Sequence, residues 1–274
     1  LPAVVGGSIT ITPDKLTGLT ITPPANSDQD FNLSVTATAT EGQAGVTPAT
    51  TTQTLAVTVN AVADAPTLSV QAASGDEDTA IAIGNKITAA LTDTDNSESL
   101  TIAISGIPTG STLANTAGDT LTVNSGSVTL TATQLVGLTI TPPSNSDVDF
   151  TLNVTATSTD GIGGPSASTG PQLLQVTVNP VADAPTLTVQ PTSGNEDTAI
   201  DLGSQITAAL VDPSETLTVT IDGIPDGASL DNDLHSVPSI ASGSVTLTAA
   251  QLVGLTITPP SNSDVDFTLN VTAT

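Results

Sequence analysis

Cysteine is absent from this 274-residue chain, so neither disulfide bonds nor thiolate metal sites can hold it together. Tryptophan and tyrosine are absent too, which leaves no aromatic platform of the kind that binds sugars. His235 is the only histidine, so no Ser–His–Asp or Cys–His set can be assembled within residues 66–184. We therefore expect no enzymatic activity.

Basic residues are almost as scarce. Lys15 and Lys86 stand against 27 acidic residues, no arginine is present, and the net charge is −25. Such a polyanion is repelled by nucleic acid phosphates and by anionic membrane surfaces. No apolar run is long enough to span a bilayer. Cations and neutral or cationic surfaces remain as partners, and we expect neither nucleic acid binding nor membrane insertion of this segment.

The most prominent feature of the sequence is repetition. The string LTITPP begins at Leu19, Leu138 and Leu255, at intervals of 119 and 117 residues. VADAPTL begins at Val62 and again 119 residues later, at Val181. A repeat of this length is a whole domain rather than one turn of a solenoid. The sequence therefore predicts a tandem array of domains.

The ADAP element marks the expected domain boundary, because proline ends a strand and small residues suit a linker. This frame makes residues 66–184 one complete repeat. Residues 1–65 are then the C-terminal part of a preceding repeat, and residues 185–274 are a repeat that lacks its last strand. Half of a sandwich exposes an open core, so we expect a longer polypeptide around this segment. The alternative is that neighbouring chains complete one another's domains.

Within residues 66–184, apolar and polar residues alternate with the period of a half-buried strand. Threonine, valine and isoleucine, which favour strands, dominate these stretches. The predicted strands cover 67–71, 99–105, 119–124, 127–131, 137–141, 149–158 and 172–179, and one helical turn is expected within 131–138. The sequence thus predicts an all-β fold of tandem Ig-like β-sandwich repeats of about 119 residues.

Acidic residues return at the same phase of the repeats, often two positions apart. Asp93 and Asp95 lie in LTDTDNSE, and Asp147 and Asp149 lie in SNSDVDF. Residues i and i+2 of a strand point to the same side, and in a turn both can face one ion. Calcium requires about six to eight hard oxygen donors. Any single pair, taken alone, could be two solvated acids in an ordinary turn. The recurrence of such pairs at matching positions of the repeats favours calcium sites.

Three stretches resemble the cadherin family, and they occur in the cadherin order. ALTDTDNSESLTIAISGIP is similar to the second-strand region of a cadherin domain. SDVDFTLNVTATSTDG is similar to the L-D-R-E segment with the strand after it, and VNPVADAP resembles the D-x-N-D-N-A-P linker. More closely, these Thr-rich, lysine-poor repeats look like the cadherin-like repeats of giant bacterial RTX-type adhesins, which are exported by type I secretion.

The resemblance implies calcium ligands around both linkers. Around the first linker these are Asp28, Asp30, Asn60, Asp64, Asp93, Asp95 and Asp160. Around the second linker they are Glu77, Asp147, Asp149, Asn179, Asp183 and Asp212. The linkers have Ala63 and Ala182 where a cadherin has an acid, so we expect fewer ions at each junction than a cadherin holds.

These features predict a structural extender, the stalk of a calcium-dependent adhesin on the bacterial cell surface. Its partners would be calcium and the neighbouring repeats of the same chain. Two alternatives remain open. The repeats could associate laterally with copies of themselves into a filament, sheath or surface layer, or they could bind a ligand as an adhesin module.

Overall fold

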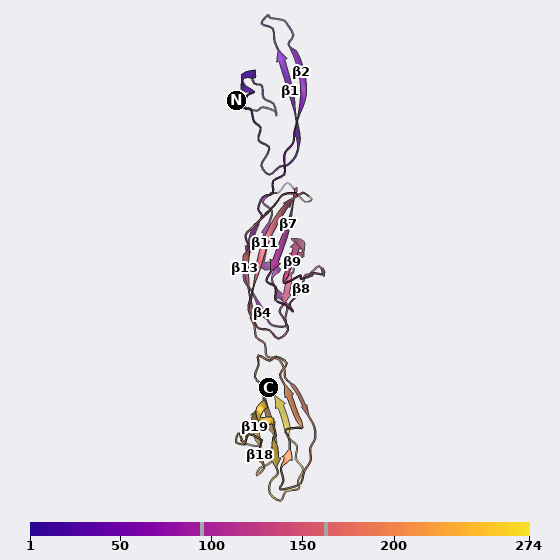
Figure 1. Cartoon of the computed structure of the whole chain (residues 1–274), viewed down its shortest axis with the longest axis vertical. Helices are drawn as coiled ribbons and strands as arrows, with labels where there is room; N and C mark the ends of the chain where they lie inside the picture. Colours follow the sequence, from indigo (N-terminus) through magenta and orange to yellow (C-terminus); the bar gives the residue numbers. More distant parts are fainter. Residues whose placement is uncertain (94–95, 162–163) are drawn as a thin grey trace. The chain divides into compact units, whose positions relative to one another are not determined.

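A computed structural model describes residues 1–93, 96–161 and 164–274, and in these residues every regular element is a β-strand or a short 3-10 turn (Figure 1). The predicted all-β fold of sandwich repeats is confirmed. None of the described segments forms a helix long and apolar enough to cross a membrane. The predicted residue Asp95 lies outside the described residues.

The contacts of the chain divide it into two compact units. The first contains residues 1–74, 81–140 and 149–177, and the second contains residues 75–80, 141–148 and 178–274. The segments around the first linker all belong to the first unit. Most segments around the second linker belong to the second unit.

The main sheet of the first unit is six-stranded and antiparallel in the pairings around its centre. In spatial order its strands are β4 (Ala73–Asp76), β13 (Gln172–Asn179), β11 (Phe150–Asp160), β7 (Glu98–Ser105) and β9 (Ser127–Thr131), and β12 (Ser166–Ser168) pairs with β11. Along β11, Leu152, Val154 and Ala156 are buried and alternate with polar residues. This alternation places one face of the sheet on the core.

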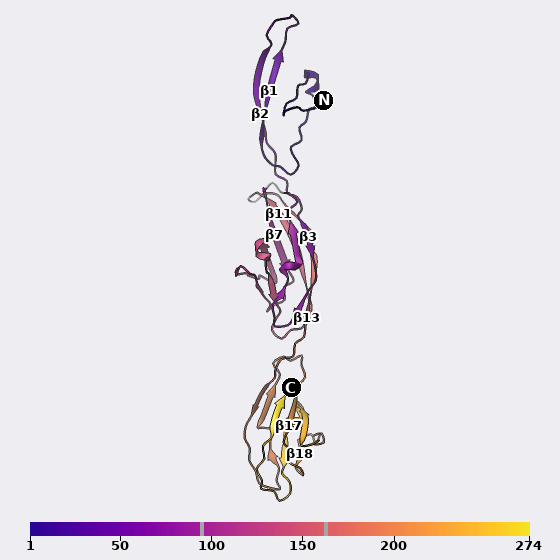
Figure 2. The same ribbon diagram turned by 180° about the vertical axis from the view of Figure 1, so that it is seen from behind.

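The other strands of the first unit form smaller sheets. A three-stranded sheet has the order β5 (Ile81–Ala82), β10 (Thr139–Thr141) and β8 (Thr112–Ala114). β3 (Thr67–Val70) pairs with β6 (Ile87–Ala90) in the same body as β7, β11 and β13 (Figure 2). Isoleucine and leucine side chains from these elements fill the core, and Ile102, Ile104 and Ile140 are fully buried.

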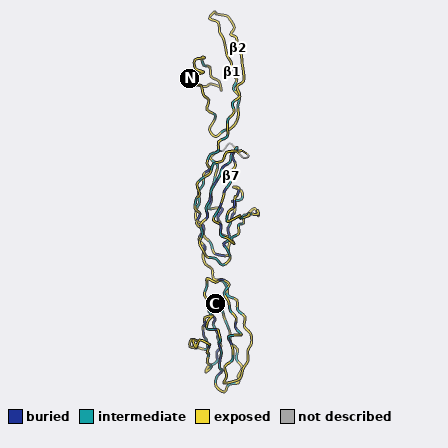
Figure 3. The backbone as a smooth tube through the Cα atoms, in the orientation of Figure 1, coloured by how far each residue is buried: buried dark blue, intermediate teal, exposed yellow. Residues whose placement is uncertain are grey.

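The N-terminal segment forms one hairpin and one 3-10 turn. β1 (Phe31–Ala39) and β2 (Ala49–Val57) pair antiparallel along their whole length, and η1 covers Pro13–Lys15. Most residues of this hairpin are exposed (Figure 3). Thr36 and Thr52, directly opposite in the register, join their hydroxyl groups at 2.8 Å.

The second unit repeats the pairing scheme of the first. Its sheets are β14 (Thr186–Val189) with β16 (Ile206–Ala209); β15 (Ile200–Asp201), β20 (Thr256–Thr258) and β18 (Ser229–Asp231); and β19 (Ser244–Thr248), β17 (Thr218–Asp222) and β21 (Asn270–Ala273). Its core contains the buried residues Val219, Ile221, Leu247 and Leu255. The duplicated strings of the sequence therefore build the same pairings twice.

Two local predictions have opposite outcomes. The 3-10 turn η3 (Thr133–Leu135) lies inside 131–138 and confirms the predicted helical turn, and its counterpart in the second unit is η4 (Ala249–Leu252). The predicted strand 119–124 is wrong, because this segment forms no ladder and has only an isolated bridge from Asn124 to Ser127. Its start is held in a loop, where Asn115 Oδ1 accepts the Asp119 N–H at 3.0 Å. Its apolar residues are only half-buried, so little core burial favours a strand here.

Candidate metal sites

A cavity of about 300 Å³ lies beside the first linker, within the first unit. Five of the seven residues that the sequence predicts for this linker line it: Asp28, Asn60, Asp64, Asp93 and Asp160. They come from segments far apart in the sequence, namely the loop after Pro23–Pro24, the linker, the turn after β6 and the end of β11. Five oxygen-bearing side chains thus border one space.

Two of these carboxylates are buried. Asp93 is 5% exposed and Asp160 is 3% exposed. Asp160 Oδ1 has no hydrogen-bond partner among the residues that the structure describes. A buried carboxylate is costly unless a counter-charge or hydrogen bonds compensate it. No ion pair found in the described part of the chain involves Asp160.

Glu98, a residue outside the predicted set, belongs to the same region. It lies directly opposite Asp160 in the register of β7 and β11, and it is 9% exposed. Its Oε1 accepts the backbone N–H of Asp64 at 2.8 Å. Its Oε2 is buried and has no hydrogen-bond partner within the described residues.

The first linker is fixed to this region through its backbone. Besides the bond to Glu98, the carbonyl oxygen of Asp64 accepts the hydroxyl of Ser158, and the Ala65 carbonyl accepts Thr92 Oγ1 at 2.7 Å. The predicted residue Asp30 contributes in the same way, because its Oδ1 accepts the Val59 N–H at 2.8 Å. These hydrogen bonds hold the linker in place. The bonds to Asp64 involve only its backbone atoms and therefore do not occupy its carboxylate.

The second linker shows a comparable arrangement in the second unit. Glu77 is 2% exposed, and its Oε1 accepts the Val181 N–H at 2.8 Å. The Glu77 N–H donates to the Asn179 carbonyl at 3.0 Å, and Asn179 Nδ2 donates to Asp76 Oδ1 at 3.1 Å. Glu77 Oε2 is buried without a partner among the described atoms.

Asp183 and Asp212 complete the second region. Asp183 donates its N–H to Glu215 Oε1 at 2.7 Å, and its Oδ2 accepts Asn145 Nδ2 at 2.7 Å. Asp212 is buried, and both its oxygens accept hydrogen bonds from Ser214, at 2.8 and 2.7 Å. Ser214 follows Asp212 by two residues, as Asp95 follows Asp93, so Asp212 satisfies its charge partly within its own turn.

The predicted pair Asp147 and Asp149 is exposed. The neighbouring Asn145 makes the contact to Asp183, and its backbone N–H donates to Asp78 Oδ1 at 2.9 Å. Sequence reasoning missed Glu98, Glu215 and Asn145 as members of these regions. The sequence did contain one signal for the two glutamates: Glu98 and Glu215 occupy matching positions in the repeated strings SESLT and SETLT.

The donor sets have the chemistry that calcium requires. They consist of carboxylate and amide oxygens, without cysteine or histidine, and three of the carboxylates carry a buried oxygen with no described partner. Within the described ranges, no group of three or more acidic or histidine side chains already forms a metal-binding geometry. The residues therefore fit calcium by donor type and burial, and their assignment as ligands stays a prediction.

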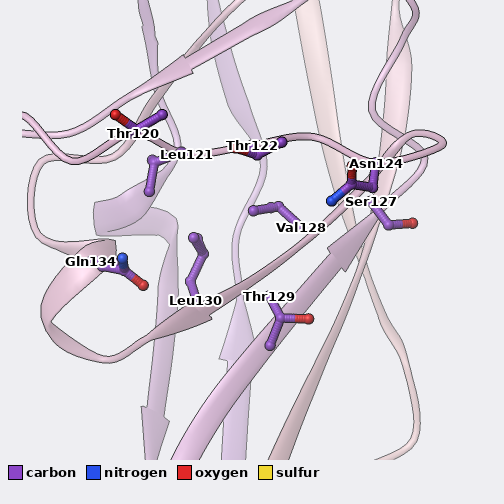
Figure 4. Close-up of a pocket in the computed structure, with 9 residues that line it drawn as sticks. All are labelled: Thr120, Leu121, Thr122, Asn124, Ser127, Val128, Thr129, Leu130 and Gln134. Atoms are coloured by element: carbon purple, nitrogen blue, oxygen red, sulfur yellow. The ribbon is translucent and has the colours of Figure 1, made fainter.

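A second cavity, of about 470 Å³, lies in the first unit between residues 120–124 and β9 (Figure 4). Leu121, Val128 and Leu130 point toward one another there (Figure 4). Its remaining lining is threonine, serine and amide side chains, with no charged residue. This cavity does not suit a cation.

No family model and no curated protein matches the chain. Among solved structures, it is similar to the crystal structure of Drosophila N-cadherin EC1-4, with 16% identity and a TM-score of 0.28. The match covers 90% of this chain and 55% of that one, so the chain spans about half the length of its neighbour. Because identity and TM-score are both low, we assign the fold from the strand pairing itself.

Proposed function

We propose that this chain is an extender segment of a bacterial cell-surface adhesin, stiffened by calcium at the linkers between its repeats. The repeat boundaries of this proposal are those expected from the ADAP elements, after residues 65 and 184. The observation that carries it is the cavity at the first linker, which Asp28, Asn60, Asp64, Asp93 and Asp160 line together.

The acids supply a reason for the linker to depend on a cation. Carboxylates that line one cavity repel one another, and the repulsion grows as the effective dielectric constant falls. Asp93 and Asp160 are buried, so water screens their charges poorly. Bound calcium supplies the positive charge that removes this repulsion. Asp64, Asp93 and Asp160 would then hold the linker and the strand ends beside it in one arrangement.

The strength of such a site suits an extracellular role. Calcium sites of extracellular modules have dissociation constants of about 10⁻⁴–10⁻³ M. Calcium at about 1 mM is about 1–10 times these constants, so it stabilises the state that binds it by about 0.4–1.4 kcal/mol per site. A chain without disulfides gains stability from such binding. Function would then be mechanical, with the segment holding a binding tip away from the cell.

Calcium titration by calorimetry tests this proposal. We expect the chain to bind calcium, and Asp160→Asn to weaken one site at least tenfold, because it removes a buried charge from the cavity. Asp119→Asn is the matched control, since it makes the same change at an exposed residue outside the linker. The absence of calcium binding at millimolar concentration would refute the proposal.

A further inference from the structure

We propose that Glu98 acts twice at the first linker: Oε1 anchors the backbone of Asp64, and Oε2 shares a calcium ion with Asp160 Oδ1. This inference rests on the proposed calcium-binding function and adds a ligand to it. The cadherin resemblance does not assign Glu98 to the site. The relation of Glu98 to Asp160 and to the linker comes from the structure.

The first observation is the pairing of two like charges. Asp160 and Glu98 are direct cross-strand partners, the last residue of β11 opposite the first residue of β7. Side chains of directly opposite residues lie on the same face, with Cβ atoms about 4.5–5.5 Å apart, and like charges there are destabilising. Both residues are buried, on the face that carries Leu152, Val154 and Ile102. Two carboxylates thus face the sandwich interior side by side.

The second observation is that each carboxylate has one buried oxygen without a partner in the part of the chain that the structure describes. These atoms are Glu98 Oε2 and Asp160 Oδ1. Buried charges of the same sign are costly when nothing pairs with them, and a bound cation offsets that cost. The chain offers only Lys15 and Lys86 as cationic side chains at neutral pH, and Lys15 pairs with Asp14. A divalent ion with a preference for hard oxygen ligands fits this position.

The two oxygens of Glu98 have different partners. Oε1 accepts the Asp64 N–H at 2.8 Å, which fixes the carboxylate relative to the linker. Oε2 is left for the ion. Because one side chain contacts both, binding at Oε2 orders the linker backbone directly.

The second linker contains the same anchor. Glu215, at the same phase of the repeat, accepts the Asp183 N–H through Oε1 at 2.7 Å. Both linker aspartates therefore donate their backbone N–H to a glutamate that follows the acid turn by a few residues. The anchor is thus a feature of the repeat and not an accident of one loop.

Glu98→Gln tests the proposal because it removes the charge and keeps a carbonyl oxygen for the Asp64 N–H. Thermal unfolding and calcium calorimetry are measured on the whole chain, in excess chelator and in 5 mM calcium. The matched control is Glu41→Gln, which removes the same charge from an exposed loop. Asp160→Asn is the partner variant.

We expect Glu98→Gln and Asp160→Asn each to raise the unfolding temperature in chelator, because each relieves the like-charge pair. Each should also lose part of the calcium-induced rise and weaken one site at least tenfold. A folding defect would instead lower the unfolding temperature in chelator, and a merely structural Glu98 would leave the calcium affinity unchanged. Either result would overturn the role of Glu98.

The test separates this inference from the proposed function. If the unmodified chain binds calcium and Glu98→Gln binds it with the same affinity at every site, Glu98 is no ligand and the calcium-binding function stands. If the unmodified chain binds no calcium, both ideas fail.

Discussion

Asn145 donates its side-chain N–H to the carboxylate of Asp183 at 2.7 Å and so ties the loop after β10 to the second linker. The same residue has a left-handed backbone, with φ of 54°, and its backbone N–H donates to Asp78. Asn262 repeats the backbone geometry, with φ of 53° and an N–H bond to Asp197 Oδ1. Its side chain, in contrast, bonds to Ser261.

This difference gives a matched pair of variants. Asn145→Gly and Asn262→Gly both keep the left-handed backbone, and both add the same flexibility to the unfolded chain. Only the first loses a hydrogen bond to a carboxylate, a bond that contributes about 1.5–3 kcal/mol. We expect Asn145→Gly to lower the free energy of unfolding in urea by about that much more than Asn262→Gly. Equal losses would show that the Asp183 contact does not stabilise the linker.

His235 provides a test by pH. Its Nδ1 lies 2.9 Å from Asp231 Oδ1, and this hydrogen bond raises the pKa of His235 above its ordinary 6.5. The contribution of the pair to stability is therefore fully present below the unfolded pKa and is lost as pH rises through the folded pKa. A titration of the imidazole by NMR should give a midpoint above 6.5, and Asp231→Asn should lower it. A midpoint unaffected by Asp231→Asn would contradict the pairing.

The core of the second unit should respond strongly to truncation. Leu247 in β19 is 1% exposed and belongs to the buried cluster around Val219 and Leu255. We expect Leu247→Ala to lower the free energy of unfolding by about 2–5 kcal/mol, because it leaves a cavity. Val253→Ala is the control, since Val253 is exposed and should change stability by less than about 0.5 kcal/mol. Similar effects at both positions would argue against this core.

Gly84 lies at a close approach between elements. A Cβ atom at this position would come within 2.1 Å of the Leu135 carbonyl oxygen, so the backbone of η3 would have to move. We expect Gly84→Ala to destabilise the chain by about 1–3 kcal/mol in urea unfolding. At Gly170 nothing lies within 4 Å of the position that a Cβ atom would take, so Gly170→Ala should be close to neutral. A neutral Gly84→Ala would show that η3 packs elsewhere.

Much of the fold follows from alternation in the sequence. The predicted strands 127–131 and 172–179 match β9 and β13, because their buried valines and leucines recur every second residue. The strands β5, β8 and β12 contain only two or three residues, too few for a period to be recognised. Residues 119–124 alternate without becoming a strand, because pairing and burial decide this and alternation alone does not.

The candidate site was predictable in part. The recurrence of acids at one phase pointed to Asp93, and the cadherin resemblance implied Asp160; both are buried beside the first linker. Glu98 was not predicted as a member of the site, because its position in the sequence shows neither its register opposite Asp160 nor its hydrogen bond to the Asp64 N–H. Asn145 was not predicted for a related reason. Its contact to Asp183 joins segments 38 residues apart, and no local pattern reports such a contact.

Small-angle X-ray scattering of the chain, in millimolar calcium and then in excess chelator, shows whether calcium stiffens the linkers. If calcium stiffens the linkers, the maximum dimension will be larger and the distance distribution sharper with calcium, and chelator will reverse both changes. Asp160→Asn should need more calcium to reach the same profile. Identical profiles in calcium and chelator would show that calcium does not stiffen the linkers and would leave the buried acids without a stiffening role.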